Sequence, residues 1–359
     1  MNAKLETITL CPYQSRQRVQ EIYQQLASNA QNISFFNSWP WLSTWLKCLP
    51  ENQKIKFVVN LANEQPTACF FLGLTHKKEN RFKKQRGFLN STGDEVFDDL
   101  VIEYNSVISP FDSPAEQLRI AFNHLSEVEE LRVPHSFGLD VSLFSDYFVR
   151  EQETPAYWVD LTQFSDIASY NTTRSKNTRH QLRQSFNAYQ NQYGPLQIVA
   201  ANSTQQALQF LDALKPLHQV YWQGKGKTGS FASTFFEVFH KTLIEDYFDA
   251  GVVQLLKVTS GKEVLGYLYN FVHNNEVLFY QSGFNYLPEN KFRPGLISHT
   301  LAIEYNLNAN KAKYNFLASH ASYKARLSTH HDMLNSWVIS KRTMTGYVEK
   351  CLRLIADKR

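Results

Sequence analysis

The chain has 359 residues, of which 43% are hydrophobic and 19% are charged, and its formal net charge at pH 7 is +4. This balance excludes a disordered chain and a coiled coil, and the length allows two domains that each bury a core of their own. The apolar run at 68–74 is far too short to span a bilayer, and the N-terminus lacks a signal-peptide pattern. We therefore expect a globular protein of the cytoplasm.

Charge and aromatic content leave two interpretations open. Basic residues cluster at Lys77–Arg86 and at Arg174–Arg183. Such clusters form either solvated surface or a contact with a polyanionic substrate or carrier. Aromatic residues make up 14% of the chain, which fits a carbohydrate or acyl pocket and a large core equally well.

The cysteines argue against a metal centre. The four cysteines are widely scattered and form no CxxC pair: Cys11, Cys48, Cys69 and Cys351. This spacing fits neither a zinc site nor a disulfide framework. We expect buried free thiols and no bound metal.

In the first half, two helices are expected before the first strands. They cover Arg16–Ala27 and residues 35–49, and Ser38 is the expected N-cap of the second. Two apolar runs follow at 55–62 and 67–76, with a polar turn between them. These runs predict a hairpin.

The rest of the first half is less regular. Residues 81–100 are basic, then glycine-rich and acidic, and predict a long loop, a kind of segment that is often functional. Its Asp94, Asp98 and Asp99 are candidates for contact with an acceptor substrate. A helix is expected over 114–130. The pattern then becomes more regular near residue 155, which suggests domains at 1–154 and 155–359, the second ending in a C-terminal helix.

In the second half, strands and helices follow one another with short connections. Strands are expected at 157–161, 196–201, 252–259, 263–272, 278–285, 314–318 and 335–340. Helices are expected at 169–192, 204–221, 231–248 and 295–308, with a short one at Tyr323. No short-period repeat is present, so a solenoid is excluded.

The order of elements near the C-terminus is the most informative feature. The strand LFYQSGFN (278–285) leads to the helix start RPGL (293–296), and a second strand leads to the dipeptide Tyr323-Lys324. A strand can place backbone groups beside a reacting carbonyl, and a helix N-terminus offers free N–H groups to phosphate. This layout suits a site that holds a phosphorylated carrier and transfers its cargo.

The same order resembles the Gcn5-related N-acetyltransferase (GNAT) fold. The segments LHQVYWQGKGKTGSF (217–231), YQSGFN, PGL and FLASHASYK (316–324) look like the branch with FemAB-like aminoacyltransferases and CelD-type (BioF2-like) proteins. The resemblance covers about residues 155–345, and NSWPWLSTWL (37–46) is similar to the early Trp-rich helix of CelD-type chains. It implies an α/β (α+β) architecture of two GNAT-like domains, each a mixed, mostly antiparallel sheet flanked by helices, the first copy degenerate.

The resemblance also implies where a donor would bind. Backbone N–H groups of a strand that separates from its neighbour would hold the thioester and pantetheine, and these map to Tyr280, Gln281, Ser282 and Gly283. The loop that would cradle the pyrophosphate maps to Arg293, Pro294, Gly295, Leu296 and Ile297. The family loop usually has a basic residue or Gln and then two glycines, whereas this one has a single glycine and a proline. That departure puts the identity of the donor in question.

Tyr323 and Lys324 are the catalytic pair that the resemblance implies. Tyr323 would protonate the departing thiolate, and Lys324 would stabilise developing negative charge; the alternative is that Tyr323 packs and Lys324 faces solvent. CelD-type chains usually read DFLRGDEPYK, whereas this chain reads NFLASHASYK. The changes at Asn315 and at 319–321 suggest a different acceptor, with His320 as a substrate contact, or lost activity.

A second group of candidates precedes a glycine-rich loop. His218 is a candidate base near neutral pH. Trp222 can stack on a sugar or acyl group, and Lys225 in the loop can contact substrate, although a Trp at helical spacing is more often a core residue. The loop QGKGKTGS (223–230) lacks the spacing of an NTPase phosphate loop. His299 is expected to pack in the core.

The sequence thus predicts an acyl-CoA-dependent N- or O-acyltransferase. The donor would be acetyl-CoA or another acyl-CoA, and the acceptor an amine or hydroxyl such as that of an amino sugar or a polysaccharide or cell-envelope precursor. One alternative is a FemAB-like aminoacyltransferase that uses aminoacyl-tRNA, favoured by the basic segment 174–183 but lacking a long heptad arm. The other is a non-catalytic binding module on the same scaffold. No DNA partner is expected, and the oligomeric state is left open.

Overall fold

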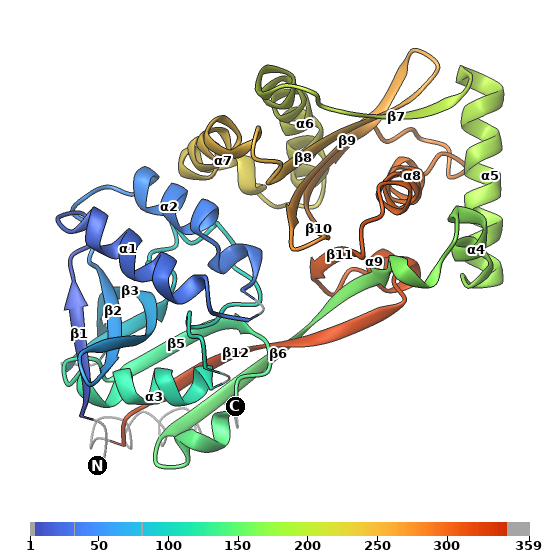
Figure 1. Cartoon of the computed structure of the whole chain (residues 1–359). Helices are drawn as coiled ribbons and strands as arrows, with labels where there is room; N and C mark the ends of the chain where they lie inside the picture. Colours follow the sequence, from blue (N-terminus) through green and yellow to red (C-terminus); the bar gives the residue numbers. More distant parts are fainter. Residues whose placement is uncertain (1–3, 32, 80–81, 112, 343–359) are drawn as a thin grey trace. The chain divides into compact units, whose positions relative to one another are not determined.

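The computed structural model describes residues 4–31, 33–79, 82–111 and 113–342, and excludes the side chains of residues 77–84 (Figure 1). The chain divides into two compact units. Unit 1 extends to Thr154 and includes the strand residues from Met333, and unit 2 is Pro155–Asp332. That last strand, which the sequence assigned to the second domain, therefore falls in unit 1. The predicted C-terminal helix, Cys351 and most of the cluster Lys77–Arg86 lie outside the described residues and side chains.

Unit 1 is a mixed sheet with helices on both faces. Its strands lie in the order β1-β2-β3-β4-β5-β12, and β4 and β5 are its parallel pair. The strands are β1 (Leu5–Leu10), β2 (Ile55–Ala62), β3 (Gln65–Glu79), β4 (Phe82–Leu89), β5 (Glu130–Ser136) and β12 (His330–Ser340). The helices are α1 (Arg16–Ala27), α2 (Trp39–Cys48) and α3 (Pro114–His124).

Side chains of the hairpin β2–β3 point alternately to its two faces and contribute to a core on each face of unit 1. Phe57 and Phe71 contact each other with ring centroids 4.9 Å apart, and Phe71 also contacts Trp45 of α2. The intervening residues Val58 and Phe70 belong to the cluster that α3 covers. Because successive strand residues point to opposite faces, one apolar hairpin serves both layers.

Three expectations for unit 1 were wrong. No strand was expected before the first helix, but β1 precedes α1 and pairs with β2. The segment 81–100 was expected to be a loop, but its first part is β4, which pairs with β3 from Phe82 to Leu89. The helix expected over 114–130 ends at His124, and strand β5 begins at Glu130. Lys and Arg residues in β4 hid the strand pattern, because they give no alternation of apolar and polar residues. The hairpin and the first two helices were predicted correctly.

Unit 2 contains the elements expected from the sequence. Its strands lie in the order β6-β11-β10-β9-β8-β7, and β10 and β11 are its parallel pair. They are β6 (Phe148–Asp160, which enters from unit 1), β7 (Leu196–Ala200), β8 (Val253–Ser260), β9 (Glu263–His273), β10 (Glu276–Phe284) and β11 (Lys313–Ala318). The helices are α4 (Ile167–Thr172), α5 (Lys176–Tyr193), α6 (Thr204–Gly224), α7 (Thr234–Tyr247), α8 (Pro294–Asn308) and α9 (Ser322–Leu327).

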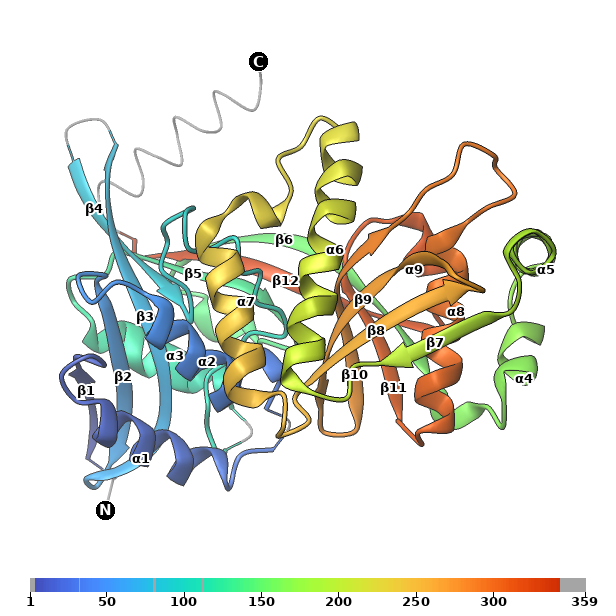
Figure 2. The same cartoon turned by 90° about the horizontal axis from the view of Figure 1, so that it is seen from above.

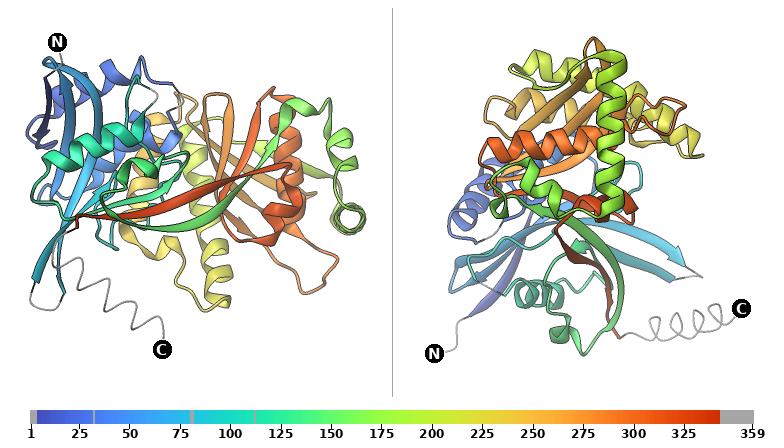
Figure 3. Two further views of the ribbon diagram at one scale, coloured as in Figure 1. Left: turned by 90° about the horizontal axis from the view of Figure 1, so that it is seen from below. Right: turned by 90° about the vertical axis from the view of Figure 1, so that its right-hand side faces the viewer.

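One helix expected in unit 2 is divided. The segment 169–192 forms α4 and α5, because the Ser175 side chain accepts a hydrogen bond from the Thr178 N–H and starts a new helix. α6 and α7 pack on one face of the sheet, and α8 and α5 pack on the other (Figures 2 and 3). The sheet of unit 2 is therefore enclosed between two helical layers.

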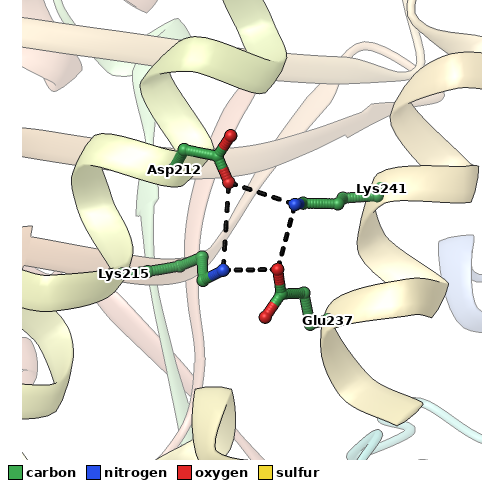
Figure 4. A network of polar contacts seen from close by, with 4 residues as sticks. All are labelled: Asp212, Lys215, Glu237 and Lys241. Carbon is green, nitrogen blue, oxygen red and sulfur yellow. Dashed lines mark hydrogen bonds and ion pairs between the residues drawn. The ribbon is translucent and has the colours of Figure 1, made fainter. Parts of the chain in front are cut away.

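A ring of four alternating charges links α6 to α7 (Figure 4). Lys241 Nζ lies 3.3 Å from Asp212 and 2.9 Å from Glu237, and Lys215 contacts the same two carboxylates. The Lys215 ammonium holds the pKa of Glu237 below its usual value. Each ion pair between partly exposed side chains contributes little to stability, but the closed network of four restrains the distance between α6 and α7.

The two units share an order of strands. In each, four antiparallel strands are followed by a helix and then by a strand parallel to the fourth: β1–β4, α3 and β5 in unit 1, and β7–β10, α8 and β11 in unit 2. Each helix makes the crossover that parallel strands require. The sheet of unit 1 thus repeats the topology of unit 2.

Other sequence expectations have mixed outcomes. Among the described helices, none is long and apolar enough to cross a membrane. The Cys69 thiol is buried, and burial raises its pKa, whereas Cys11 is exposed, contrary to expectation.

The close approach of α6 to β10 gives a test of this packing. A Cβ on Gly283 would lie 2.3 Å from the Leu214 carbonyl oxygen and 2.9 Å from Leu217 Cβ. We expect Gly283→Ala to destabilise the protein by about 1–3 kcal/mol through overpacking, measured by chemical denaturation. Gly224→Ala, where a Cβ meets no atom within 4 Å, is the matched control and should be neutral. Equal stability of both variants would refute this packing.

Candidate active site

Strands β10 and β11 separate soon after they begin. They pair only over Glu276–Leu278 and Lys313–Asn315. Beyond that point β10 remains paired with β9 up to Phe284, and β11 remains paired with β6 up to Ala318. Among the described residues, no strand therefore pairs with the edge of β10 that faces β11 at Phe279 and over 281–284. The predicted donor-binding residues Tyr280–Gly283 lie on this edge, and their contact with a donor stays a prediction.

A bulge at Tyr280 sets the direction of the side chains along β10. Phe279 pairs with Asn270 and Gln281 with Tyr269, so Tyr280 is the extra residue. A bulge of this kind re-aims side chains and is common beside active sites. Tyr280 packs among the aromatic rings of α7 and β9, with centroids 5.1 Å from His240 and 4.8 Å from Phe271. Its side chain is thus part of the layer under α7.

On the α8 side, aromatic rings surround His299. The His299 ring is stacked on Tyr323 at 5.4 Å and lies 4.5 Å from Phe279. His299 is 1% exposed, and its Nε2 atom has no hydrogen-bond partner among the described residues. Burial lowers the pKa of His299 to about 3, and the Lys324 charge contributes. The imidazole is therefore neutral at physiological pH, and as expected from the sequence it packs in the core.

Tyr323 and Lys324 lie at the start of α9, beside the opening between the strands. The Lys324 ammonium is 3.4 Å from the carbonyl oxygens of Leu317 and Ala318 and 5.9 Å from the Phe279 ring centre. It is 8% exposed, so Lys324 does not face solvent. Burial raises the pKa of the Tyr323 phenol, which keeps its proton at neutral pH. The phenol can therefore donate a proton.

His218 is a buried residue of α6 and lies on the opposite face of β10. It is 2% exposed, its Nδ1 atom is 3.1 Å from Gln219 Oε1, and no described atom pairs with its Nε2. Burial lowers the pKa of His218, and the nearby Gln219 and Gln281 side chains oppose that shift. A neutral imidazole can accept a proton. Within the described residues, no contact joins His218 to Tyr323 or Lys324.

Three tyrosines connect these two sides. Tyr221 of α6 stacks on Tyr286, with ring centroids 5.3 Å apart at 25°. Both phenols are close enough to Tyr323 to raise its pKa further. Burial and Tyr221 raise the pKa of Tyr286 to about 12. Sequence reasoning missed Tyr221 and Tyr286; Tyr221 is one turn after His218, which is a usable signal, but nothing marks Tyr286.

The predicted pyrophosphate loop is tightly packed. A Cβ on Gly295 would lie 3.2 Å from the Phe284 ring, so this glycine accommodates an aromatic side chain. The Arg293 N–H donates to Ser185 Oγ of α5, and the Arg293 Nε–H donates to the Asn290 carbonyl. Arg293 Nη1 is buried and has no partner among the described residues. Pro294 and Ile297 are buried and Leu296 is half-buried. An anion at the start of α8 could therefore accept a hydrogen bond from Arg293 Nη1.

The remaining predicted substrate contacts lie near the surface. Lys225 is exposed, with its ammonium 5.9 Å from the Tyr221 ring centre, and Trp222 is half-buried, 6.0 Å from the His218 ring. His320 is exposed on the loop between β11 and α9, and Ser282 is half-buried on β10. No group of three His, Cys, Asp or Glu side chains in the described part of the chain could hold a metal ion.

These positions are chemically complementary. A neutral His218 can take a proton, and a protonated Tyr323 can give one. The unpaired edge of β10 and the Lys324 ammonium can stabilise an anion that develops between the strands. The arrangement therefore has the groups that acyl transfer from a good leaving group requires.

Comparisons with known proteins support the fold. No curated protein sequence matches the chain. A conserved protein of unknown function from Bacteroides thetaiotaomicron is 10% identical, with a TM-score of 0.55, covering 90% of this chain and 97% of that one. FemX is 9% identical, with a TM-score of 0.51 and coverages of 92% and 96%. L-PGS from Bacillus licheniformis is 12% identical, with a TM-score of 0.51 and coverages of 94% and 96%.

The family described as "Acetyltransferase (GNAT) domain" matches residues 176–325. This segment runs from the start of α5 into α9 and includes β10, α8 and β11. It also includes every residue predicted for catalysis, for donor binding or for substrate contact in the second half of the chain, but not Asp94, Asp98 and Asp99. Unit 2 therefore carries a GNAT-fold, acyltransferase-like domain.

Proposed function

We propose that unit 2 transfers an acyl group from an acyl-CoA, acetyl-CoA in the first instance, to an amine or hydroxyl acceptor. The observation that carries this proposal is the parting of β10 from β11 within the segment that matches the GNAT family. The unpaired edge of β10 can bind the pantetheine chain and the thioester carbonyl. The acceptor, on this proposal, is an amino sugar or a precursor of a polysaccharide or of the cell envelope.

The two faces of the opening fit the two substrates. The donor would enter on the α8–α9 side, where Arg293 Nη1 is free for a phosphate oxygen and Tyr323 and Lys324 lie. The acceptor would enter on the α6 side, where His218, Trp222 and Lys225 lie. Attack then forms the C–N or C–O bond and breaks the C–S bond. His218 takes the proton of the nucleophile, Lys324 stabilises the oxyanion, and Tyr323 protonates the thiolate.

One observation favours a second candidate, transfer from aminoacyl-tRNA. The outer side of α5 exposes Lys176, Arg179, His180 and Arg183. Such a surface can bind a nucleic-acid backbone, and its affinity would fall steeply as salt concentration rises. FemX and L-PGS share the fold at about a tenth sequence identity, which carries no substrate to this chain.

Removal of the Tyr323 hydroxyl tests the proposed acid. We expect Tyr323→Phe to lower kcat for acyl transfer from acetyl-CoA by about 10²–10⁴-fold, with KM changed little, because only protonation of the leaving group is lost. Tyr305→Phe, on the last turns of α8, is the matched control and should keep wild-type kcat. Steady-state kinetics that show wild-type turnover for Tyr323→Phe would exclude the phenol as the acid.

The pH profile tests His218. Because the pKa of His218 is lowered from 6.5, the base is deprotonated above about pH 6.5, and kcat/KM should fall only at lower pH. We expect His218→Gln to lower kcat/KM by about 10²–10⁴-fold and to remove this acid limb. Thermal unfolding at pH 7.5 checks that the variant is folded. An unchanged acid limb in a folded His218→Gln variant would assign that limb to another group.

A further inference from the structure

Unit 1 contains a cavity at the place that corresponds to the opening in unit 2. Strands β4 and β5 pair only over Arg86–Phe88 and Glu130–Arg132 and then part, as β10 and β11 do. A cavity of about 500 Å³ lies where they part, with Phe88, Arg132 and Val133 in its wall. Asp98, residues 100–102, residues 150–152 of β6 and residues 336–338 of β12 also contribute to the lining. The topology that the two units share thus includes the early separation of the two parallel strands.

The wall of this cavity is mostly apolar. Leu100, Val101 and Ile102 contribute one side, and Val133, Pro134 and Val338 contribute to the other. Val101 is 44% exposed at the rim. A cavity of a few hundred cubic ångströms with apolar walls and a few polar groups is typical of small-molecule sites.

Arg132 in the wall of the cavity is held in a fixed position by two contacts. Its Nε–H donates to Glu130 Oε1 at 2.9 Å, and its guanidinium lies over the Phe88 ring at 5.6 Å. Glu130 is fully buried, and Arg86 Nε lies 3.0 Å from the same carboxylate oxygen. One carboxylate therefore serves two guanidinium groups. Among the described residues, the two terminal nitrogens of Arg132 have no hydrogen-bond partner, so they are available to a ligand.

The Trp337 indole is a second donor that lacks a described partner, but its side chain lies on the other face of the sheet from Arg132, packed with Val133 in the core that α3 covers. Trp337 is 7% exposed, and its Nε1–H is buried without a partner in the described part of the chain. A buried donor without an acceptor costs about 1–3 kcal/mol. By contrast, the Asp98 carboxylate accepts hydrogen bonds from the Thr92 N–H and hydroxyl and from the Gly93 N–H. The terminal nitrogens of Arg132 therefore call for an acceptor on the ligand.

The backbone beside the cavity departs from regular strand geometry at two places. The pairing of β5 with β12 shifts register between Asn335 and Trp337, where Ser336 Oγ accepts from the His135 N–H. His135 has a φ of 42°, a left-handed conformation that is rare outside glycine and asparagine. Bulges and strained residues of this kind cluster at binding sites.

We infer that this cavity binds a small organic anion, a carboxylate or a phosphate monoester with an apolar body. The anionic oxygens would accept from the terminal nitrogens of Arg132, and the body would lie against Leu100 and Val101. Arginine suits this role because its planar fork matches two oxygens of one anionic group. The site lies wholly in unit 1 and does not depend on the acyl transfer proposed for unit 2.

Isothermal titration calorimetry of the full chain tests this site. Octanoate represents a carboxylate ligand, and octyl phosphate represents a phosphate monoester. Octanamide has the same apolar chain as octanoate but no charge, and acetate has the charge but no apolar chain. We expect one of the two anions to bind in a 1:1 complex, octanamide to bind at least tenfold more weakly, and acetate not to bind. Binding of neither anion, or equal affinity for octanamide, would overturn the inference.

Two variants locate the binding. Val101→Asp places a negative charge at the exposed rim and should weaken anion binding at least tenfold, whereas Val101→Asn, of the same shape, should weaken it less. Arg132→Gln should reduce the affinity for the anion to that for octanamide. Tyr323→Phe should leave the affinity unchanged, because Tyr323 belongs to unit 2. Loss of binding in Tyr323→Phe, or unchanged binding in Val101→Asp, would place the ligand elsewhere and refute the site.

Discussion

The parting of β10 from β11 is the constraint on which the proposed chemistry depends. Side chains from α8 and α9 hold the strands apart, because His299 and Tyr323 stack together against Phe279 of β10. On the other strand, Leu317 has a φ of 62°, and its N–H donates to Asn315 Oδ1. Strain of this kind persists only where the surroundings enforce it. The opening is therefore a packed feature of unit 2, with one edge of β10 unpaired.

Packing from both faces fixes the position of that edge. Gly283 lets α6 approach β10, and Gly295 lets the Phe284 ring lie against the start of α8. Because of the bulge at Tyr280, Phe279 and Phe284 both face α8, although they are five positions apart, a spacing that places residues on opposite faces of a regular strand. His218 and Tyr323 consequently approach the opening from opposite faces. A base and an acid on opposite sides of one carbonyl suit a transfer in which the nucleophile and the leaving group are on different sides.

The sequence predicted the elements of unit 2 well, because its apolar runs are bounded by clear turns such as Ser260-Gly261-Lys262. It failed at β4, where lysines and arginines hide a strand whose pairing with β3 supplies the stability. Within the site, the sequence placed Tyr323 and Lys324 but gave no sign of Tyr286, which reaches Tyr221 only through tertiary structure. The free donors of Arg132 and Trp337 were equally invisible, because an unpaired group is a property of the packed state.

Hydrogen exchange of the backbone amides of β10 tests the central claim most directly. If the unpaired edge of β10 binds the donor, saturating acetyl-CoA should slow exchange at residues 279–284 and at the start of α8. The strands β1–β3 of unit 1 should serve as an internal reference and stay unchanged. Protection confined to other elements, or no protection when calorimetry shows acetyl-CoA bound, would contradict the account.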